Sequence, residues 1–327
     1  MSPAVLLAAS GALVGGLLAL GLVLPNWLLF LVTLAASHGV VSLGIVLLMR
    51  GGVVSFGQGL VFAVGGYAVA LAVNRLGLTE APLLILLAAA AAGLVGAAAG
   101  PLLSRYSGIF FGMLTLALSM VLYGVLLKST ALGGSDGFNI PRPTLLGRRL
   151  DGAGGDYALY ALTVVVTGVV SYLAALYIRS VRGLMSLAVQ ANALRVEYLG
   201  ASARAVTTVN FVLAAVLGGT GGALTVLALG HIEPDFAYWT RSGEFVFVAI
   251  LAGPQSVAAV FVASLVLELV RSFSNLYFPN TWQLALGLFL LAVILFLPRG
   301  IGSLWAGRRS PRAEAATVLE ARGAPAE

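Results

Sequence analysis

Long apolar runs recur along the chain, and short polar segments separate them. A hydrocarbon core about 30 Å thick needs about 20 residues of helix to cross it. Runs such as residues 83–103 are apolar on every face, so they predict membrane-spanning helices rather than strands of alternating polarity. The expected spans are Ala4–Leu24, Leu28–Met49, Leu60–Val73, Pro82–Leu103, Gly108–Leu127, Tyr157–Ile178, Thr207–Leu229, the long stretch Glu244–Val270, and Trp282–Leu297.

Arginine positions predict the orientation of these spans. Basic residues favour cytoplasmic loops, and an interior N-terminus puts Arg50, Arg105 and the loop 179–205 on that side. If Glu244–Val270 crossed once, Arg299 and the arginines after it would lie outside, against this bias. Pro254 also disfavours helix at Gly253. We therefore expect two limbs, Glu244–Ala252 and Ser256–Val270, of a broken or re-entrant hairpin near Gly253-Pro254.

The predicted fold is an all-α, polytopic membrane helix bundle of about 8–10 spans. Residues 1–305 form one transmembrane domain. Residues 306–327 are rich in Ala, Arg, Glu and Pro and lack an apolar period, so they predict a disordered cytoplasmic tail.

Composition agrees with a membrane protein. The chain is 60% hydrophobic and 9% charged, with a mean hydropathy of +1.04. Its net charge of +6 reflects topology, and we expect no nucleic-acid partner. There is no cysteine, and no motif for an enzyme. The only lysine, Lys128, follows Leu127 and not a glycine, so the sequence holds no P-loop.

The segment from Gly51 to Tyr67 is rich in glycine at a predicted membrane boundary. Such backbone is either unwound beside a translocation path or packed tightly against another helix, and the residues favour neither alternative. The third span begins earlier than Leu60 if the segment is helical. The candidate residues are Ser55, Gly57, Gln58, Gly59, Gly65 and Gly66.

The longest predicted exterior loop, from Lys128 to Asp156, contains the polar sequence Gly133, Gly134, Ser135, Asp136, Gly137. Glycines supply turns with positive φ, and an aspartate caps turns. These residues predict a shaped loop. Such a loop either seats a delivery protein on the outer face or is a plain connector.

In the interior loop 179–205, apolar residues recur at steps of three and four, which predicts a short amphipathic helix. Gly183 is expected to precede this helix and Gly200 to end it. With few basic residues, the helix suits a groove on a protein partner better than a lipid surface. Apolar positions are Leu184, Leu187, Ala188, Ala191, Leu194 and Tyr198, and another face carries Ser186, Gln190, Ala193 and Glu197.

Ionisable residues inside the predicted spans are few. His38 has no obvious partner in the sequence, so we expect it to be buried and to face the bundle. Glu268 lies near a predicted helix end and is the main candidate for a proton or ion relay. His231 lies in an exterior loop that Pro234 interrupts, which disfavours a metal site.

Seven segments, in the same order, carry a resemblance to a known family. The chain resembles the permease subunits of bacterial branched-chain amino-acid ABC importers, in particular the LivM type, to which urea and amide permeases are related. The segments are VSFGQGLVFAVGGY (54–67), SGIFFGMLTLAL (107–118), LGGSDGF (132–138), RSVRGLMSLAVQANALRVEYLGA (179–201), FVLAAVLGGTGGAL (211–224), LAGP (251–254) and LPRGI (297–301).

The resemblance implies a permease in the bacterial inner membrane. It implies a second permease subunit, cytoplasmic subunits that bind ATP, and an extracytoplasmic substrate-binding protein, with no cofactor in this chain. The loop 179–201 would be the coupling helix on which the ATPases push. Residues Gly133–Gly137 would face the binding protein. Residues of the coupling loop are Arg179, Arg182, Gly183, Leu187, Glu197 and Gly200.

Two alternatives stay open. The first is an ABC permease for urea or short amides. The second belongs to another class, a stand-alone secondary transporter or channel, which ionisable residues deep in the spans would indicate.

Overall fold

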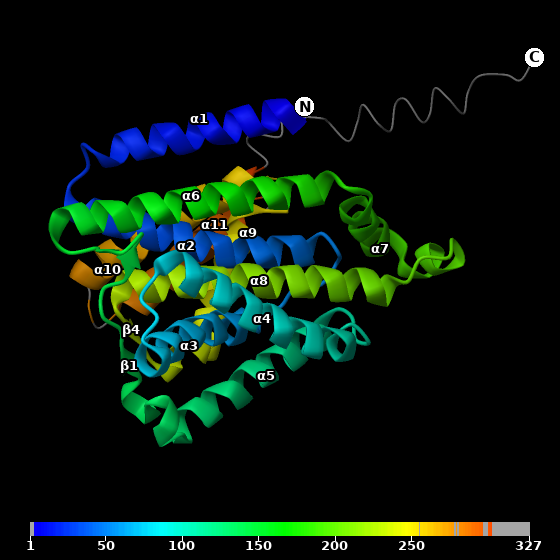
Figure 1. The fold of residues 1–327 in the computed structure, drawn as a ribbon. Helices are drawn as coiled ribbons and strands as arrows, with labels where there is room; N and C mark the ends of the chain where they lie inside the picture. The colour runs from blue at the N-terminus through cyan, green and yellow to red at the C-terminus, as the bar shows by residue number, and fades with distance from the viewer. Residues whose placement is uncertain (1–2, 255, 278, 280, 297–299, 303–327) are drawn as a thin grey trace, which may run out of the picture.

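The apolar runs fold into helices close to the predicted bounds (Figure 1). The computed structural model describes residues 3–254, 256–277, 279, 281–296 and 300–302, so the predicted tail 306–327 lies outside them. The helices are α1 (Pro3–Gly21), α2 (Asn26–Met49), α3 (Gln58–Leu76), α4 (Ala81–Leu103), α5 (Ile109–Lys128), α6 (Gly152–Arg179), α7 (Val181–Tyr198), α8 (Ala203–Leu229), α9 (Trp239–Ala252), α10 (Val257–Tyr277) and α11 (Trp282–Phe296).

Seven helices of the described chain are long and apolar enough to cross a membrane. They are α2, α3, α4, α5, α6, α8 and α10. Helices α1, α9 and α11 are apolar, and the last two have only 14 and 15 residues. The expected all-α, multi-pass helix bundle is confirmed.

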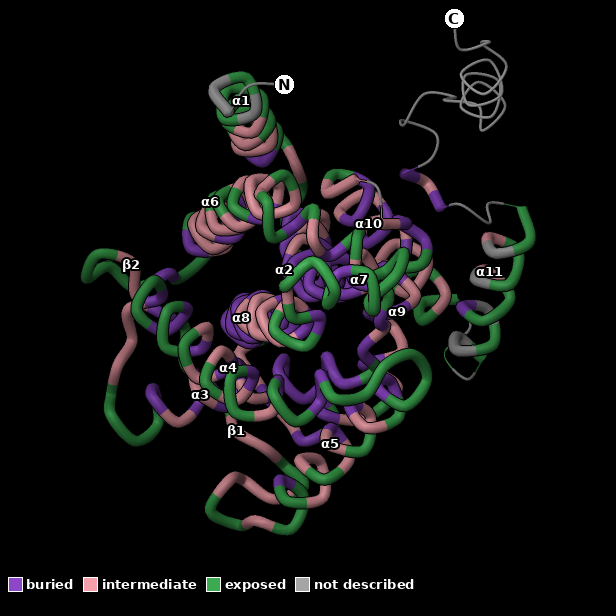
Figure 2. The backbone as a smooth tube through the Cα atoms, turned by 90° about the vertical axis from the view of Figure 1, so that its right-hand side faces the viewer, coloured by how far each residue is buried: buried purple, intermediate pink, exposed green. Residues whose placement is uncertain are grey.

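Helix α8 forms the centre of the bundle, between α2, α3 and α4 (Figure 2). Small residues allow this approach. A Cβ on Gly218 would lie 2.5 Å from Val61 Cγ2, and a Cβ on Gly96 would lie 2.6 Å from Ala215 Cβ. Gly96–Gly100 in α4 and Gly218–Gly222 in α8, both with the spacing GxxxG, therefore lie where helices pack together. Gly11 and Gly15 in α1 have the same spacing, and a Cβ on either would meet nothing within 4 Å among the described residues.

The predicted break near Gly253-Pro254 is confirmed. Helix α9 ends at Ala252, Gly253 has φ +75°, and α10 begins at Val257. Arg50 Nη1 donates to the Pro254 carbonyl at 3.0 Å, so this turn lies beside the end of α2. The predicted end of the second limb was wrong, because α10 continues to Tyr277. Glu268 therefore lies inside a helix and not near its end.

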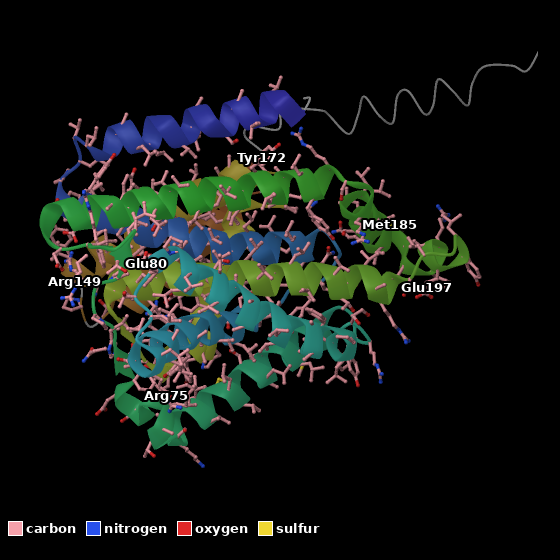
Figure 3. All side chains as sticks on the ribbon, viewed as in Figure 1. Arg75, Glu80, Arg149, Tyr172, Met185 and Glu197 are labelled. Atoms are coloured by element: carbon pink, nitrogen blue, oxygen red, sulfur yellow. The ribbon has the colours of Figure 1, made fainter. Side chains whose placement is uncertain are left out.

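The two ends of the bundle differ. One end carries α7 and is called here the α7 end; Figure 3 labels Met185 and Glu197 there. The opposite end carries Glu80 and Arg149, the 3₁₀ turns η1 (Thr130–Leu132), η2 (Gly134–Asp136) and η3 (Pro234–Ala237), and two small sheets. In these sheets β1 (Phe138–Asn139) pairs with β4 (His231–Ile232), and β2 (Thr144–Leu145) pairs with β3 (Arg148–Arg149), both antiparallel.

Candidate functional site

Helix α7 starts earlier than the sequence predicts. The Ser180 hydroxyl accepts a hydrogen bond from the Gly183 N–H and caps the helix, so Gly183 lies in its first turn and does not precede it. Gly183 is buried against the backbone of Tyr177 and Ile178, which leaves no space for a side chain. Gly200 follows the helix with φ +84°, in the predicted role.

A break divides α7 at Asn192, whose φ of −164° and ψ of 98° are not helical. The Asn192 Oδ1 accepts the N–H of Arg195 at 2.9 Å, so it caps the second part of the helix. The prediction of one continuous helix was wrong at this residue. Asparagine competes with the helical backbone for hydrogen bonds, which is the physical reason for the break.

Gly183, Ser186 and Val196 of α7 face the bundle, and most of its other side chains, polar and apolar, are exposed. Ser186 is 2% exposed, whereas Leu184 is 56%, Leu194 60% and Tyr198 82% exposed. Apolar side chains in such a position need a partner or lipid to cover them. The other predicted loop residues, Arg179, Arg182, Leu187 and Glu197, are exposed as well.

Three neutral polar side chains hold α7 to the bundle. Asn210 Oδ1, in α8, accepts the Tyr177 hydroxyl of α6 at 2.6 Å. Asn210 Nδ2 donates to the Ser186 Oγ of α7 at 2.9 Å. This set, Tyr177, Ser186 and Asn210, is called here the neutral joint. It brings three helices together at the α7 end.

Helix α3 begins inside the bundle and not at its surface. Its first residue, Gln58, lies beside Gly218 in the middle of α8 and beside Gly44, more than one turn before the end of α2. The backbone from 51 to 57 is not helical. The Gly57 N–H donates to Ser55 Oγ at 3.2 Å. Unwound backbone at this depth is tolerated only within protein or beside water.

The glycines of this segment also make close contacts. A Cβ on Gly59 would lie 2.7 Å from Ser242 Oγ, and a Cβ on Gly57 would lie 2.5 Å from the Thr115 carbonyl oxygen. Gly65 packs on the backbone of Gly219, and Gly66 on Ile232. Residues 51–57 are unwound, and the glycines from 57 onward pack tightly. Their place in a translocation path stays a prediction.

Helix α9 begins at the same level as α3. The Gly59 N–H donates to Ser242 Oγ at 2.9 Å, and Ser119 Oγ of α5 donates to the Ala237 carbonyl at 2.7 Å. The first turns of two interrupted helices therefore lie side by side. In transporters, such helix starts commonly border the path of the substrate.

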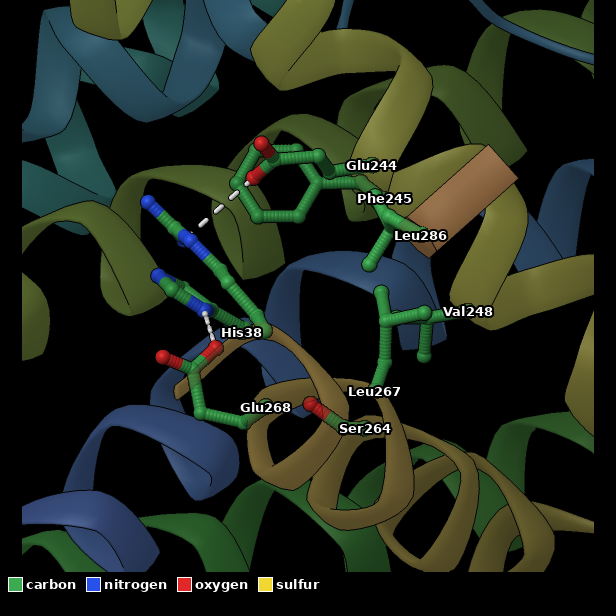
Figure 4. Close-up of a pocket in the computed structure, with 9 residues that line it drawn as sticks. His38, Glu244, Phe245, Val248, Ser264, Leu267, Glu268 and Leu286 are labelled. Carbon is green, nitrogen blue, oxygen red and sulfur yellow. Dashed lines mark hydrogen bonds and ion pairs between the residues drawn. The ribbon is translucent and has the colours of Figure 1, made fainter. Parts of the chain in front are cut away.

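Charged side chains join α9 to α10 through Glu244 and Arg271, and α10 to α2 through Glu268 and His38 (Figure 4). Glu244 Oε2 accepts Arg241 Nη1 at 3.2 Å and Arg271 Nη1 at 3.4 Å, and His38 Nδ1 lies 3.2 Å from Glu268 Oε2. The cavity between them has a volume of about 10 Å³, the space of one water molecule. We call these five residues the charged cluster; its cavity is too small for a substrate.

The loop at the opposite end is shaped, as predicted. Gly133, Gly134 and Gly137 have φ of +88°, +56° and +67°. The Ser135 hydroxyl donates to Asp136 Oδ1 at 2.9 Å. Gly137 packs on the Ile232 carbonyl, where β1 pairs with β4. The loop is thereby fixed to the segment that leads to α9, and its binding of a delivery protein stays a prediction.

Residues 27–297 match the family model described as branched-chain amino acid transport system / permease component. The match covers well over half of the 327 residues. The chain belongs to this permease family. No curated protein and no solved structure matches it. The permease is therefore a multi-pass membrane subunit of an ABC transporter.

Sequence reasoning found some of the permease's polar contacts and missed others. His38 is buried and faces the bundle, as predicted, and its partner is Glu268. Asn210 and Ser242 escaped notice, although a carboxamide inside an apolar span was a usable signal for Asn210. Arg241 and Arg271, close to predicted span ends, gave no sign that they share Glu244.

Proposed function

We propose that this permease imports branched-chain amino acids, forming the path with a second permease subunit, and that separate cytoplasmic ATPase subunits drive it through α7. The exposed apolar side chains of α7 carry this proposal. Ser186 holds α7 to the bundle through the neutral joint, and the exposed Leu184, Leu194 and Tyr198 are available for a groove on another protein. The family description supports the choice of substrate.

The α7 end faces the cytoplasm of a bacterium in this proposal, with both termini on that side of the inner membrane. Arg50, Arg105 and Arg204 flank helix ends there, as the distribution of basic residues favours. The loop Gly133–Gly137 then faces an extracytoplasmic substrate-binding protein. ATP is bound by the partner subunits, since this sequence has no P-loop.

One observation favours a different class of function. Proton-coupled transporters use buried ionisable residues, and the His38–Glu268 pair is of that type. Family membership favours the ABC importer over such a stand-alone transporter. Among ABC substrates, urea and short amides are the alternative to branched-chain amino acids.

Cysteine cross-linking tests the role of α7, because the chain has no cysteine of its own. Leu187→Cys, on α7, is expected to cross-link to an ATPase subunit in membranes that contain the whole transporter. Leu146→Cys is the matched control, since Leu146 is 90% exposed at the opposite end. Cross-linking at 146 but not at 187 contradicts the proposal, as does uptake by this chain alone without ATP.

The substrate is tested on the binding protein that serves this permease. Calorimetry with leucine, isoleucine, valine, urea and acetamide is expected to give heat of binding with the amino acids. Binding of urea or acetamide alone would replace the proposed substrate and leave the role of α7 intact.

A further inference from the structure

Asn210 lies where four segments of the α7 end meet. It is 1% exposed and contacts Tyr177 of α6 and Ser186 of α7 through the neutral joint. The turn after α2 packs on the same side chain, since a Cβ on Gly51 would lie 3.1 Å from Asn210 Nδ2. A single carboxamide thus touches α6, α7, α8 and the end of α2.

The turn after α2 also touches α7 directly. A Cβ on Gly52 would lie 3.3 Å from the Cα of Gln190, and Gly52 has φ +79°. The adjacent Arg50 donates to the Pro254 carbonyl between α9 and α10. Residues 50–52 therefore connect α7 to the end of α2 and to the turn between α9 and α10. A displacement of α7 would reach these helix ends, which lie beside the candidate path.

The chemistry of the joint suits a part that moves. All three side chains are neutral, and Ser186 Oγ has a second acceptor, the Arg182 carbonyl at 3.2 Å in its own helix. Asn210 Oδ1 also accepts Ser186 Oγ at 3.3 Å. The serine hydroxyl can thus exchange acceptors as α7 shifts, without leaving a buried charge behind.

We propose that Asn210 is the positioning residue that transmits displacement of α7 to α8 and α6. This inference rests on the proposed function, in which ATPase subunits push on α7. Asn210 touches neither ATP nor substrate. Its hydrogen bonds link Ser186 of α7 and Tyr177 of α6 to α8, which packs along α2, α3 and α4 and so carries the displacement into the bundle.

The experiment measures substrate uptake and ATP hydrolysis together, in proteoliposomes that contain the whole transporter and its binding protein. In Asn210→Ala, uptake per ATP hydrolysed is expected to fall about tenfold, because the buried hydrogen bonds to both Tyr177 and Ser186 are lost. Tyr177→Phe removes one hydroxyl with little change in shape and is expected to lower the ratio about threefold. Ser186→Ala added to Asn210→Ala is expected to cause little further loss.

Thr225→Val is the matched control. Thr225 lies on the same helix, is 2% exposed, and donates only within α8, to the Gly221 carbonyl at 2.9 Å. Its substitution is expected to leave uptake per ATP unchanged. A merely structural role for Asn210 predicts fewer assembled transporters with the same ratio of uptake to hydrolysis.

The Leu187→Cys cross-link separates the two proposals. If the cross-link forms while Asn210→Ala and Tyr177→Phe keep the parent ratio, the inference about Asn210 is overturned and the proposed function stands. If the cross-link is absent in the parent transporter, both are overturned. A lower ratio with the cross-link intact supports both.

Discussion

Helices α7 and α9 are held to the bundle by opposite kinds of polar contact. In the charged cluster Glu244–Arg271 joins α9 to α10 and His38–Glu268 joins α10 to α2, whereas the neutral joint holds α7 with Tyr177, Ser186 and Asn210. Both sets are largely buried. They differ in whether a charged or a neutral group is left without a partner when a contact is lost.

Removing one partner of a buried ion pair leaves an uncompensated charge, which costs about 3–5 kcal/mol. Removing one partner of a buried neutral hydrogen bond leaves one unpaired polar group, which costs about 1–3 kcal/mol. The charged cluster therefore resists separation of α9 from α10, and the hydrogen bonds of the neutral joint can rearrange while α7 stays linked to α8 and α6. The comparison fits a transporter in which one helix is fixed near the path and another receives the push.

The largest effect is expected for Glu244→Ala. Glu244 accepts from both Arg241 and Arg271, so its removal leaves two guanidinium groups without that acceptor. Stability is expected to fall by about 3–5 kcal/mol, measured as a lower midpoint of thermal unfolding in detergent. Asp156→Asn is the control, since Asp156 and its partner Arg142 are 40% and 53% exposed and such pairs contribute less than about 1 kcal/mol. Equal shifts of the unfolding midpoint in the two variants would contradict the expectation that the buried ion pairs contribute more stability than the exposed one.

A smaller effect is expected for Glu268→Gln. Glutamine keeps an acceptor for His38 and removes only the charge, so the loss of stability is about 1–2 kcal/mol. ATP-driven uptake is expected to continue in this variant, because in the proposed function the His38–Glu268 pair joins α2 to α10 and ATP, not a proton gradient, drives transport. Loss of uptake together with loss of a proton current would favour the secondary transporter.

The smallest effect is expected for Asn192→Ala. It removes the cap on the second part of α7, which contributes about 1 kcal/mol. Hydrogen exchange is expected to quicken for amides from 195 to 198 and to stay unchanged in the first part of α7, which Ser180 caps. Faster exchange throughout α7 would show that the two parts of the helix are not independent.

The sequence predicted most of the fold, because length and hydrophobicity suffice to define a membrane helix. It placed the break at Gly253 correctly, since proline and glycine act locally. It did not show which helices touch. Gly218 packs tightly and Gly11 contacts nothing described, yet both occur in the same motif.

The polar contacts were harder to predict than the helices. His38 and Glu268 are 230 residues apart in sequence, so only the packing of α2 on α10 pairs them. In the sequence Asn210 is a single polar residue in an apolar span, and only the structure shows that Tyr177 and Ser186 are its partners. For the candidate residues Ser55 to Gly66 the sequence identified the unusual backbone, but not the Ser242 and Thr115 contacts that stabilise it.

Helix starts inside the bundle depend on hydroxyl groups. Ser55, Thr115 and Ser242 each accept a backbone N–H where α3 starts, and Ser119 donates to the carbonyl just before α9. In hydrocarbon no solvent can replace them. A scan that converts each serine and threonine to alanine, with stability as the readout, would therefore locate the helix starts inside the bundle without any structure. At those sites the lost hydroxyl leaves a buried backbone group without a hydrogen-bond partner.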